Sequence, residues 1–362
     1  MQLHTIWFLI IVVFWLGFFV LEGFDYGVGM LHMFVGRSET ARRVEINTIG
    51  PWWDGNEVWL VAAGGAMFAA FPGWYATMFS ALYLALVLVL LALMARGTSF
   101  EYRGKHDSDR WRSTWSWALT IGSLLVPLLL GVALGDLLTG LPINHNHDFT
   151  GNFGDLFTGY GLMTGVTLVV LCLLHGATFL SLRTTGHLRD RARAAGGVIG
   201  PVAILINLAY VAWTLVVIGG STVPQPTQIF GLLAVIFAAA LVRTELDGWA
   251  FFASAFAIAA AIGQIFIALY PNVMVSSTTG ANNLTVNNVA AGHYSLVVMT
   301  VAAALLVPVV LVYQGWSFRV FRRRVTAEPA SAVPAGGAAA SAGPASSGGP
   351  TATGGSGGPT SG

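Results

Sequence analysis

The chain has 362 residues, of which 55% are hydrophobic and only 9% are charged, and its mean hydropathy is +0.72. Soluble domains carry about 25% charged residues, so this composition excludes a soluble globular protein and predicts an all-α polytopic membrane protein. The formal net charge of +1 gives no reason to expect a nucleic-acid partner, and the single cysteine, Cys172, excludes an intrachain disulfide.

The first hydrophobic segment, residues 7–35, contains two acidic residues in its interior. A membrane span needs roughly 20 residues, so this segment is long enough to cross a bilayer. Glu22 falls near its centre, and Asp25 follows one helical turn later on nearly the same face. An ionisable side chain at that depth costs at least about 2.5 kcal/mol and usually faces protein or a water-filled path. Both acids are therefore candidate functional residues.

Eight further hydrophobic segments follow, which predicts about nine transmembrane helices in total. They are residues 54–71, 74–95, 114–138, 156–182, 196–219, 228–242, 248–270 and 291–318. All 17 lysines and arginines lie in the loops or the terminus that follow odd-numbered segments. The positive-inside rule then places the N-terminus outside the cell and the C-terminus in the cytoplasm.

The last part of the chain differs sharply in composition from the rest. Residues 326–362 are mainly Gly, Ala, Ser, Pro and Thr and carry almost no charge. Such a composition is typical of a disordered low-complexity segment, because it offers nothing with which to form a core. We therefore expect one transmembrane helical domain over residues 1–325, followed by a disordered cytoplasmic tail over residues 326–362.

The second segment begins with two acidic residues at the predicted cytoplasmic boundary. Asp54 and Glu57 are three residues apart, so they share a helical face, and the helix dipole favours a carboxylate in this first turn. Helix capping explains the pair as well as proton transfer does. Arg96, Glu101 and Arg103 lie at the cytoplasmic end of the third segment, and Arg103 is interpreted as an ordinary positive-inside anchor.

Protonatable groups occur at successive depths between the cytoplasmic surface and the membrane centre. They are Asp54, Glu57, Glu22, Asp25 and His175. Burial and neighbouring arginines shift carboxyl pKa values in opposite directions, so such groups can exchange protons near neutral pH. The outer half of the membrane has too few acids for a continuous relay. The sequence therefore predicts a proton path that starts at the cytoplasm and stops inside the protein.

The histidines do not have the arrangement that a haem would need. A bis-histidine haem requires two histidines that face each other at matching depths, and His175 has no partner at its own depth. His145 and His147 alternate near Asp148 in an outer loop, which fits a solvated loop better than a metal site. We therefore expect no haem and no metal bound by this chain.

Four motifs together resemble subunit II of the cytochrome bd quinol oxidases. They are GFDYGVG at residues 23–29, WDGNEVWL at 53–60, Arg96 with FEYR at 100–103, and TGNF at 150–153. The resemblance extends from the first segment to about Arg324 and does not include the tail. His175 and His293 lie where this family has no fixed histidine, so the resemblance assigns them no role.

The resemblance implies a multi-pass subunit of a heterodimeric terminal oxidase in the bacterial inner membrane. In this family, subunit II is haem-free and pairs with a haem-bearing subunit I, which carries haems b558, b595 and d and oxidises quinol. Oxygen is reduced to water with cytoplasmic protons, which contributes to the proton motive force. A small single-span accessory subunit, membrane lipid and, in some members, a bound quinone are further expected partners.

The resemblance also assigns roles to individual acidic residues. Proton supply is carried over to the acids that match the family motifs, Asp25 and Asp54. The remaining path residues are added on position: Glu57 as an extra carboxylate, Arg96 as the charge that keeps acids ionised, Glu101 as a surface collector, and Glu22 by its spacing. No residue of this chain is assigned a directly catalytic role.

Three alternatives stay open on physical grounds, of which a purely structural membrane scaffold leaves the intramembrane acids unexplained. Asp25 and Asp54 could instead pair with Arg37 or Arg96 and lock helices together without moving protons. A proton-coupled secondary transporter would use Glu22 and Asp25 to couple proton movement to a substrate, but it predicts internal repeats and a midplane site that both sides can reach. The sequence has no convincing repeat and no matching polar route in its outer half.

Overall fold

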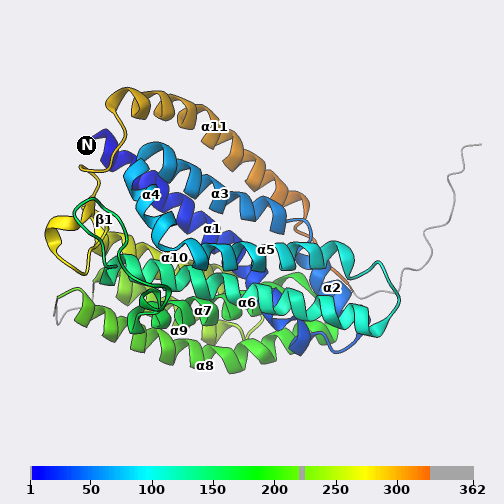
Figure 1. Cartoon of the computed structure of the whole chain (residues 1–362). Coiled ribbons are helices and arrows are strands. Elements are labelled where there is room, and N and C mark those ends of the chain that lie inside the picture. The colour runs from blue at the N-terminus through cyan, green and yellow to red at the C-terminus, as the bar shows by residue number, and fades with distance from the viewer. Residues whose placement is uncertain (1, 220–224, 327–362) are drawn as a thin grey trace, which may run out of the picture. The chain divides into compact units, whose positions relative to one another are not determined.

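The computed structural model describes residues 2–219 and 225–326. The predicted tail, residues 326–362, lies outside these ranges except for its first residue, so its disorder stays a prediction. The described chain is almost entirely helical, with a small loop region that contains two short strands (Figure 1). The α-helices are α1 (Leu3–Val35), α2 (Glu39–Ile49), α3 (Trp53–Ala70), α4 (Pro72–Ala81), α5 (Tyr83–Tyr102), α6 (Asp109–Thr139), α7 (Gly159–Arg183), α8 (Gly186–Val217), α9 (Pro226–Leu241), α10 (Asp247–Leu269) and α11 (His293–Val320).

Seven of the helices in the described ranges are long and apolar enough to cross a membrane, namely α1, α5, α6, α7, α8, α10 and α11. The predicted all-α polytopic fold class is therefore confirmed. Helix α9 is shorter, and α3 carries acids in its first turns. The count of nine spans and the predicted orientation stay predictions.

Two elements differ from the sequence-based expectation. The predicted third span, residues 74–95, is divided into α4 and α5 at Leu82, whose φ of −92° and ψ of 13° are not those of an α-helix. The segment after α1 forms the separate helix α2, which begins where Ser38 accepts a hydrogen bond from the Ala41 amide at 3.1 Å. This side-chain cap satisfies an amide at the start of a helix that is too polar to be a span.

Helix α1 is the centre of the helical bundle and packs against α3, α6, α7 and α10. Its closest approach is to α7, where Gly27 faces Gly176. A Cβ atom built on Gly27 would meet the Cys172 carbonyl oxygen and would lie 2.7 Å from Gly176 Cα. The two backbones are therefore in contact, which small residues allow in membrane helix pairs.

We expect the substitution Gly27→Ala to destabilise the protein by about 1–3 kcal/mol, because the added methyl group has only backbone to displace. Thermal unfolding of the detergent-solubilised protein would measure the loss. Gly65→Ala in α3 is the matched control, since a Cβ atom there meets nothing within 4 Å. Equal melting temperatures for the two variants would contradict the close packing of α1 on α7.

At the end of the bundle opposite α2, the connecting loops fold against one another. Strand β1 (Asn272–Met274) pairs antiparallel with β2 (Leu284–Thr285). The TGNF motif lies in these loops and makes hydrogen bonds within its own turn. The Asn152 side chain accepts a hydrogen bond from the Gly154 amide at 2.8 Å, and the Asp155 carboxylate accepts one from the Asn152 amide at 2.7 Å. These bonds form a capping box for the 3₁₀-helix η1 (Phe153–Leu156).

Helix α11 lies at the edge of the bundle, beside α3 (Figure 1). Leu296 is the one buried residue of α11, which lies wholly within the described ranges. Its polar contacts with the rest of the protein include Trp7, whose indole nitrogen lies 3.0 Å from Thr300 Oγ1, and the Gln314 amide, which reaches Asn56 of α3. Most of its apolar surface therefore faces outward.

Candidate acid cluster

Three buried or half-buried charges from three helices meet inside the bundle. Arg96 of α5 places Nη1 2.6 Å from Glu22 Oε1 of α1 and 2.6 Å from Glu57 Oε1 of α3. The Glu22 and Arg96 side chains are fully buried, whereas Glu57 is 23% exposed. Glu22 and Glu57, which the sequence places at successive depths of a predicted proton path, form a single ion-pair cluster with Arg96.

Two aromatic rings flank the Arg96 guanidinium and help to compensate its burial. Its Cζ lies 4.8 Å from the centre of the Tyr26 ring and 5.3 Å from that of Phe100, and such cation–π contacts favour a desolvated arginine. Nε and Nη2 of Arg96 and Oε2 of Glu22 have no hydrogen-bond partner among the described residues. Buried polar atoms of this kind are usually satisfied by ordered water.

Asp25 is held by an amide and not by an ion pair. Asn56 of α3 donates from Nδ2 to Asp25 Oδ2 at 2.7 Å and also to the Leu21 carbonyl at 3.0 Å. The same side chain accepts a hydrogen bond at Oδ1 from Gln314 of α11 at 3.2 Å. Asp25 is fully buried, and its Oδ1 has no hydrogen-bond partner in the described part of the chain. One carboxylate oxygen is therefore fixed, and the other is left for water.

The other two predicted path residues lie outside this cluster. Asp54 is exposed in the first turn of α3, and Glu101 is exposed near the end of α5. Asp54 lies one turn before Glu57 on the same helix, so α3 connects an exposed acid to the buried cluster. Within the described ranges, neither Asp25 nor Asp54 forms an ion pair, and the bond of Asp25 to another helix comes from Asn56.

His175 is not hydrogen-bonded to these acids, although it was expected in the same string. Its Nε2 lies 3.2 Å from the Val20 carbonyl and its Nδ1 lies 2.7 Å from Ser254 Oγ. The ring stacks on Phe251, with 4.5 Å between ring centres. Both ring nitrogens of His175 therefore bond to residues of α1 and α10 and help to pack α7 against these helices. The polar side chain that contacts Asp25 is Asn56 and not His175.

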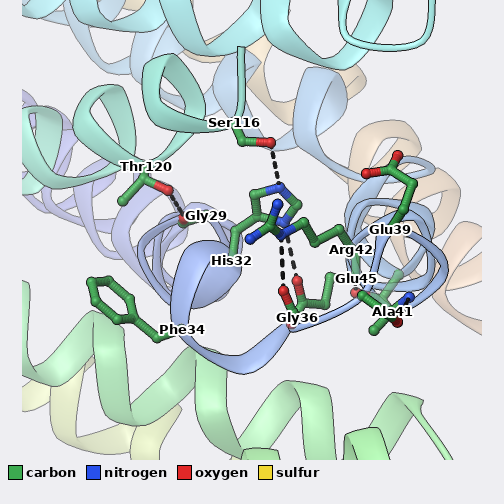
Figure 2. A network of polar contacts seen from close by, with 12 residues as sticks. Gly29, His32, Phe34, Gly36, Glu39, Ala41, Arg42, Glu45, Ser116 and Thr120 are labelled. Atoms are coloured by element: carbon green, nitrogen blue, oxygen red, sulfur yellow. Dashed lines mark hydrogen bonds and ion pairs between the residues drawn. The ribbon is translucent and has the colours of Figure 1, made fainter. Parts of the chain in front are cut away.

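A second polar network, which the sequence did not predict, joins α2 and α6 to the end of α1 (Figure 2), and Arg103 of α5 also belongs to it. His32 Nδ1 lies 3.0 Å from Glu45 Oε2, and His32 Nε2 lies 3.1 Å from Ser116 Oγ. Arg103 donates from Nε to the same Ser116 oxygen at 2.8 Å and binds both oxygens of Glu39, at 2.8 and 2.6 Å. Arg103 is therefore a buried network residue and not only a surface anchor.

Burial controls the protonation of Glu45, which belongs to the surface helix α2. Its side chain is fully buried, and desolvation raises the pKa of its carboxyl group to about 9. Arg42, Arg191 and Arg103 oppose this rise without cancelling it. Glu45 is therefore protonated at neutral pH and donates to His32 Nδ1, so the imidazole carries its proton on Nε2 and donates to Ser116.

Glu39 behaves in the opposite way, although it belongs to the same helix. Partial burial alone would raise the pKa of its carboxyl group, but the hydrogen bonds and charge of Arg103 lower it below the ordinary value. Glu39 is thus ionised and Glu45 neutral at the same pH. The short helix α2 therefore presents two acids in different protonation states to the membrane domain.

This assignment predicts how the stability of the protein depends on pH. Because the pKa of Glu45 is higher in the folded than in the unfolded chain, its contribution is complete below about pH 4.5 and is lost as the pH rises toward 9. The free energy of unfolding should therefore fall with rising pH by at most about 1.4 kcal/mol per pH unit for this one group. Glu45→Gln keeps a donor to His32 but cannot titrate, so it should flatten this pH dependence. Melting temperatures measured from pH 5 to 9 would show the difference. Glu39→Gln, the control, should leave the slope in place.

Comparisons with known proteins agree with the fold and with the motifs around the acid cluster. A family model described as "Cytochrome bd terminal oxidase subunit II" matches residues 3–321. The chain is 45% identical over 329 residues to cytochrome bd ubiquinol oxidase subunit 2 of Bacillus subtilis (strain 168), covering 90% of this chain and 97% of that protein.

Two further comparisons extend this agreement. Cytochrome bd-I ubiquinol oxidase subunit 2 of Escherichia coli (strain K12) is 37% identical over 363 residues, covering 90% of this chain and 96% of that protein. A chain in the structure of bd oxidase from Geobacillus thermodenitrificans has the same fold, with a TM-score of 0.70 at 19% identity over 89% of this chain and 99% of that one. The protein is therefore a multi-pass protein of the bacterial inner membrane that belongs to the cytochrome bd terminal oxidase subunit II family.

Proposed function

We propose that this chain is the haem-free subunit II of a bd-type terminal quinol oxidase, in which it supports the haem-bearing subunit I and supplies cytoplasmic protons for the reduction of oxygen to water. The observation that carries the proposal is the acid cluster, in which Glu22 and Asp25 are fully buried and Arg96 and Asn56 hold them in place. Buried charges are expensive in a membrane and are usually functional. Family membership argues against the proton-coupled transporter.

Protons would enter from the exposed acids at the cytoplasmic ends of α3 and α5, Asp54 and Glu101. Glu57 is the next acceptor, because it is partly exposed and also touches Arg96. Arg96 stays charged at any physiological pH, so it stabilises whichever carboxylate has lost its proton. The free oxygens of Glu22 and Asp25 then pass protons, through ordered water, toward the partner subunit.

The buried histidines of the described chain support a haem-free subunit. A haem ligand needs a free imidazole nitrogen, but both nitrogens of His32 and both nitrogens of His175 already have hydrogen-bond partners. The residues present thus do not fit haem ligation by these two histidines. Haems b558, b595 and d are accordingly assigned to subunit I, with quinol and oxygen as the substrates of the complex.

Purification of the chain from its native membrane in mild detergent tests this assignment. We expect haem b and haem d bands in the reduced-minus-oxidised spectrum to co-purify with quinol-driven oxygen uptake, and to leave with the partner when the complex is dissociated. Haem retained by the isolated chain would contradict the haem-free role. A preparation with neither haem nor oxygen uptake would contradict the oxidase assignment itself.

A further inference from the structure

Polar residues form two facing stripes where α1 packs against α6. The spacing of three or four residues places each set on a single helical face. The set on α1 is Glu22, Tyr26, Gly29 and His32, and the set on α6 is Ser116, Thr120 and Ser123. His32 is bonded to Ser116 at 3.1 Å, and Thr120 donates to the Gly29 carbonyl at 3.1 Å (Figure 2). We call this line of contact the α1–α6 seam.

The seam begins at the buried pair Glu45 and His32. The segment that joins α1 to α2 covers Glu45, since a Cβ atom on Gly36 would lie 2.5 Å from Glu45 Oε2. The positive charges around Glu45 are hydrogen-bonded to other groups: Arg42 to the Gly36 carbonyl, Arg191 to the Phe34 carbonyl, and Arg103 to Ser116 and Glu39. Glu45 is therefore bonded to the imidazole of His32 and not to a guanidinium.

The seam continues from His32 to the acid cluster. Ser123 is packed against Gly29, where a Cβ atom would lie 2.8 Å from Ser123 Cβ. Tyr26 comes next on the same face of α1, and its ring lies 4.8 Å from the Cζ atom of Arg96. Arg96 contacts Glu22 at 2.6 Å. His32 and Glu22 are ten residues apart, so the seam is about 15 Å long.

Buried polar atoms along the seam lack hydrogen-bond partners among the described residues. They are Glu45 Oε1, Ser123 Oγ, the Tyr26 hydroxyl and Arg96 Nη2. A buried polar atom without a partner costs about 1–3 kcal/mol unless water satisfies it. Because these atoms occur at both ends and in the middle of the seam, ordered water along it would satisfy all of them together.

We propose that the α1–α6 seam is a second uptake route for cytoplasmic protons, in which Glu45 and His32 deliver protons through ordered water, past Ser123 and Tyr26, to Glu22. The inference rests on the proposed function, because it gives the acid cluster a second supply in parallel with Asp54. The residues of the route belong to α1, α2 and α6, whereas Asp54 and Glu57 belong to α3, so the two supplies share no residue before the cluster.

Each transfer conserves protons. Glu45 gives its proton to His32 Nδ1 while the Nε2 proton of the imidazole passes to Ser116 Oγ, whose own hydroxyl proton passes to water in the seam. The Glu45 carboxylate then takes a proton from the cytoplasm, and the imidazole is left protonated on Nδ1. A turn of the His32 side chain then presents the Nδ1 proton to Ser116 and the free Nε2 to Glu45, so the next proton follows the same route. Arg103 keeps its proton and positions Ser116 for this transfer.

Double substitution in the complete oxidase, purified with its haem-bearing partner, tests the parallel routes. Glu45→Gln and Asp54→Asn should each lower quinol-driven oxygen uptake by roughly twofold at pH 8, whereas the double variant should lose more than the product of the two, about tenfold or more. Ser123→Ala should reproduce the effect of Glu45→Gln, because it interrupts the seam without touching α2. Thr114→Ala, on an exposed face of α6, is the matched control.

A double variant no slower than Asp54→Asn alone would overturn the proposal and leave Glu45 as a structural residue. A normal rate for Ser123→Ala combined with Asp54→Asn would overturn it as well, even if Glu45→Gln fails to fold. Failure of the proposed function is distinguished by Glu22→Gln, because both routes deliver protons to Glu22. If that variant turns over normally, the cluster itself carries no protons.

Discussion

Replacing Asp25 by asparagine is expected to slow quinol-driven oxygen uptake on the order of 100-fold, while the haem content of the complex stays unchanged. The asparagine oxygen can still accept the hydrogen bond that Asn56 donates at 2.7 Å, so the packing of α1 against α3 should survive. The free oxygen of the carboxylate, however, loses its ability to take up and release a proton.

Oxygen uptake and the haem spectrum should be measured on the same preparation. Asp136→Asn is the matched control, because Asp136 is also a buried carboxylate with one hydrogen-bond donor, Thr158 at 2.6 Å, but lies on the opposite half of α6 from the seam. Loss of the assembled complex in the Asp25 variant would instead support a structural lock. Normal turnover would remove Asp25 from the path.

Replacing Arg96 by leucine is expected to destabilise the subunit by about 3–5 kcal/mol, enough to prevent assembly of the oxidase. The change leaves Glu22 fully buried without its counter-ion and removes the cation between the Tyr26 and Phe100 rings. Yield of the haem-containing complex and its melting temperature report the loss.

A second substitution separates the charge effect from the packing effect. Adding Glu22→Gln to Arg96→Leu removes the uncompensated charge, so the double variant should recover part of the lost stability. Lys105→Leu serves as the control, because Lys105 is exposed in the loop after α5. A double variant as unstable as Arg96→Leu would show that the aromatic contacts of Arg96, and not its ion pair with Glu22, hold the helices together.

The acid cluster was largely predictable from the sequence because charges inside apolar segments are rare. Glu22 and Asp25 stand out for that reason. By contrast, Glu57 and Arg96 lie at the cytoplasmic ends of predicted segments and were added on position. A buried acid needs a partner within the protein. Asn56 did not stand out, because it is uncharged and lies between Asp54 and Glu57, which both attract attention as acids at the start of an apolar segment. Its position in the WDGNEVWL motif is the only feature that could have drawn attention to it.

The network around His32 could not be predicted because it depends on contacts between distant parts of the chain. His32 meets Glu45 across a turn and Ser116 across 84 residues of sequence. Periodicity shows which face of a helix is apolar, but not which helix packs against it. The same limit applies to α2, whose polar residues resembled a loop until the Ser38 cap and the burial of Glu45 were seen.

Gln314 connects the helix at the edge of the bundle, through Asn56, to the fully buried carboxylate of Asp25. Helix α11 exposes most of its length, so its position responds to the lipids or proteins beside it. A sideways shift of α11 would break the 3.2 Å bond from Gln314 and let the Asn56 side chain rotate, which would weaken the donor that fixes Asp25. A change in the lateral pressure of the surrounding bilayer would therefore act, through two amides, on a fully buried acid.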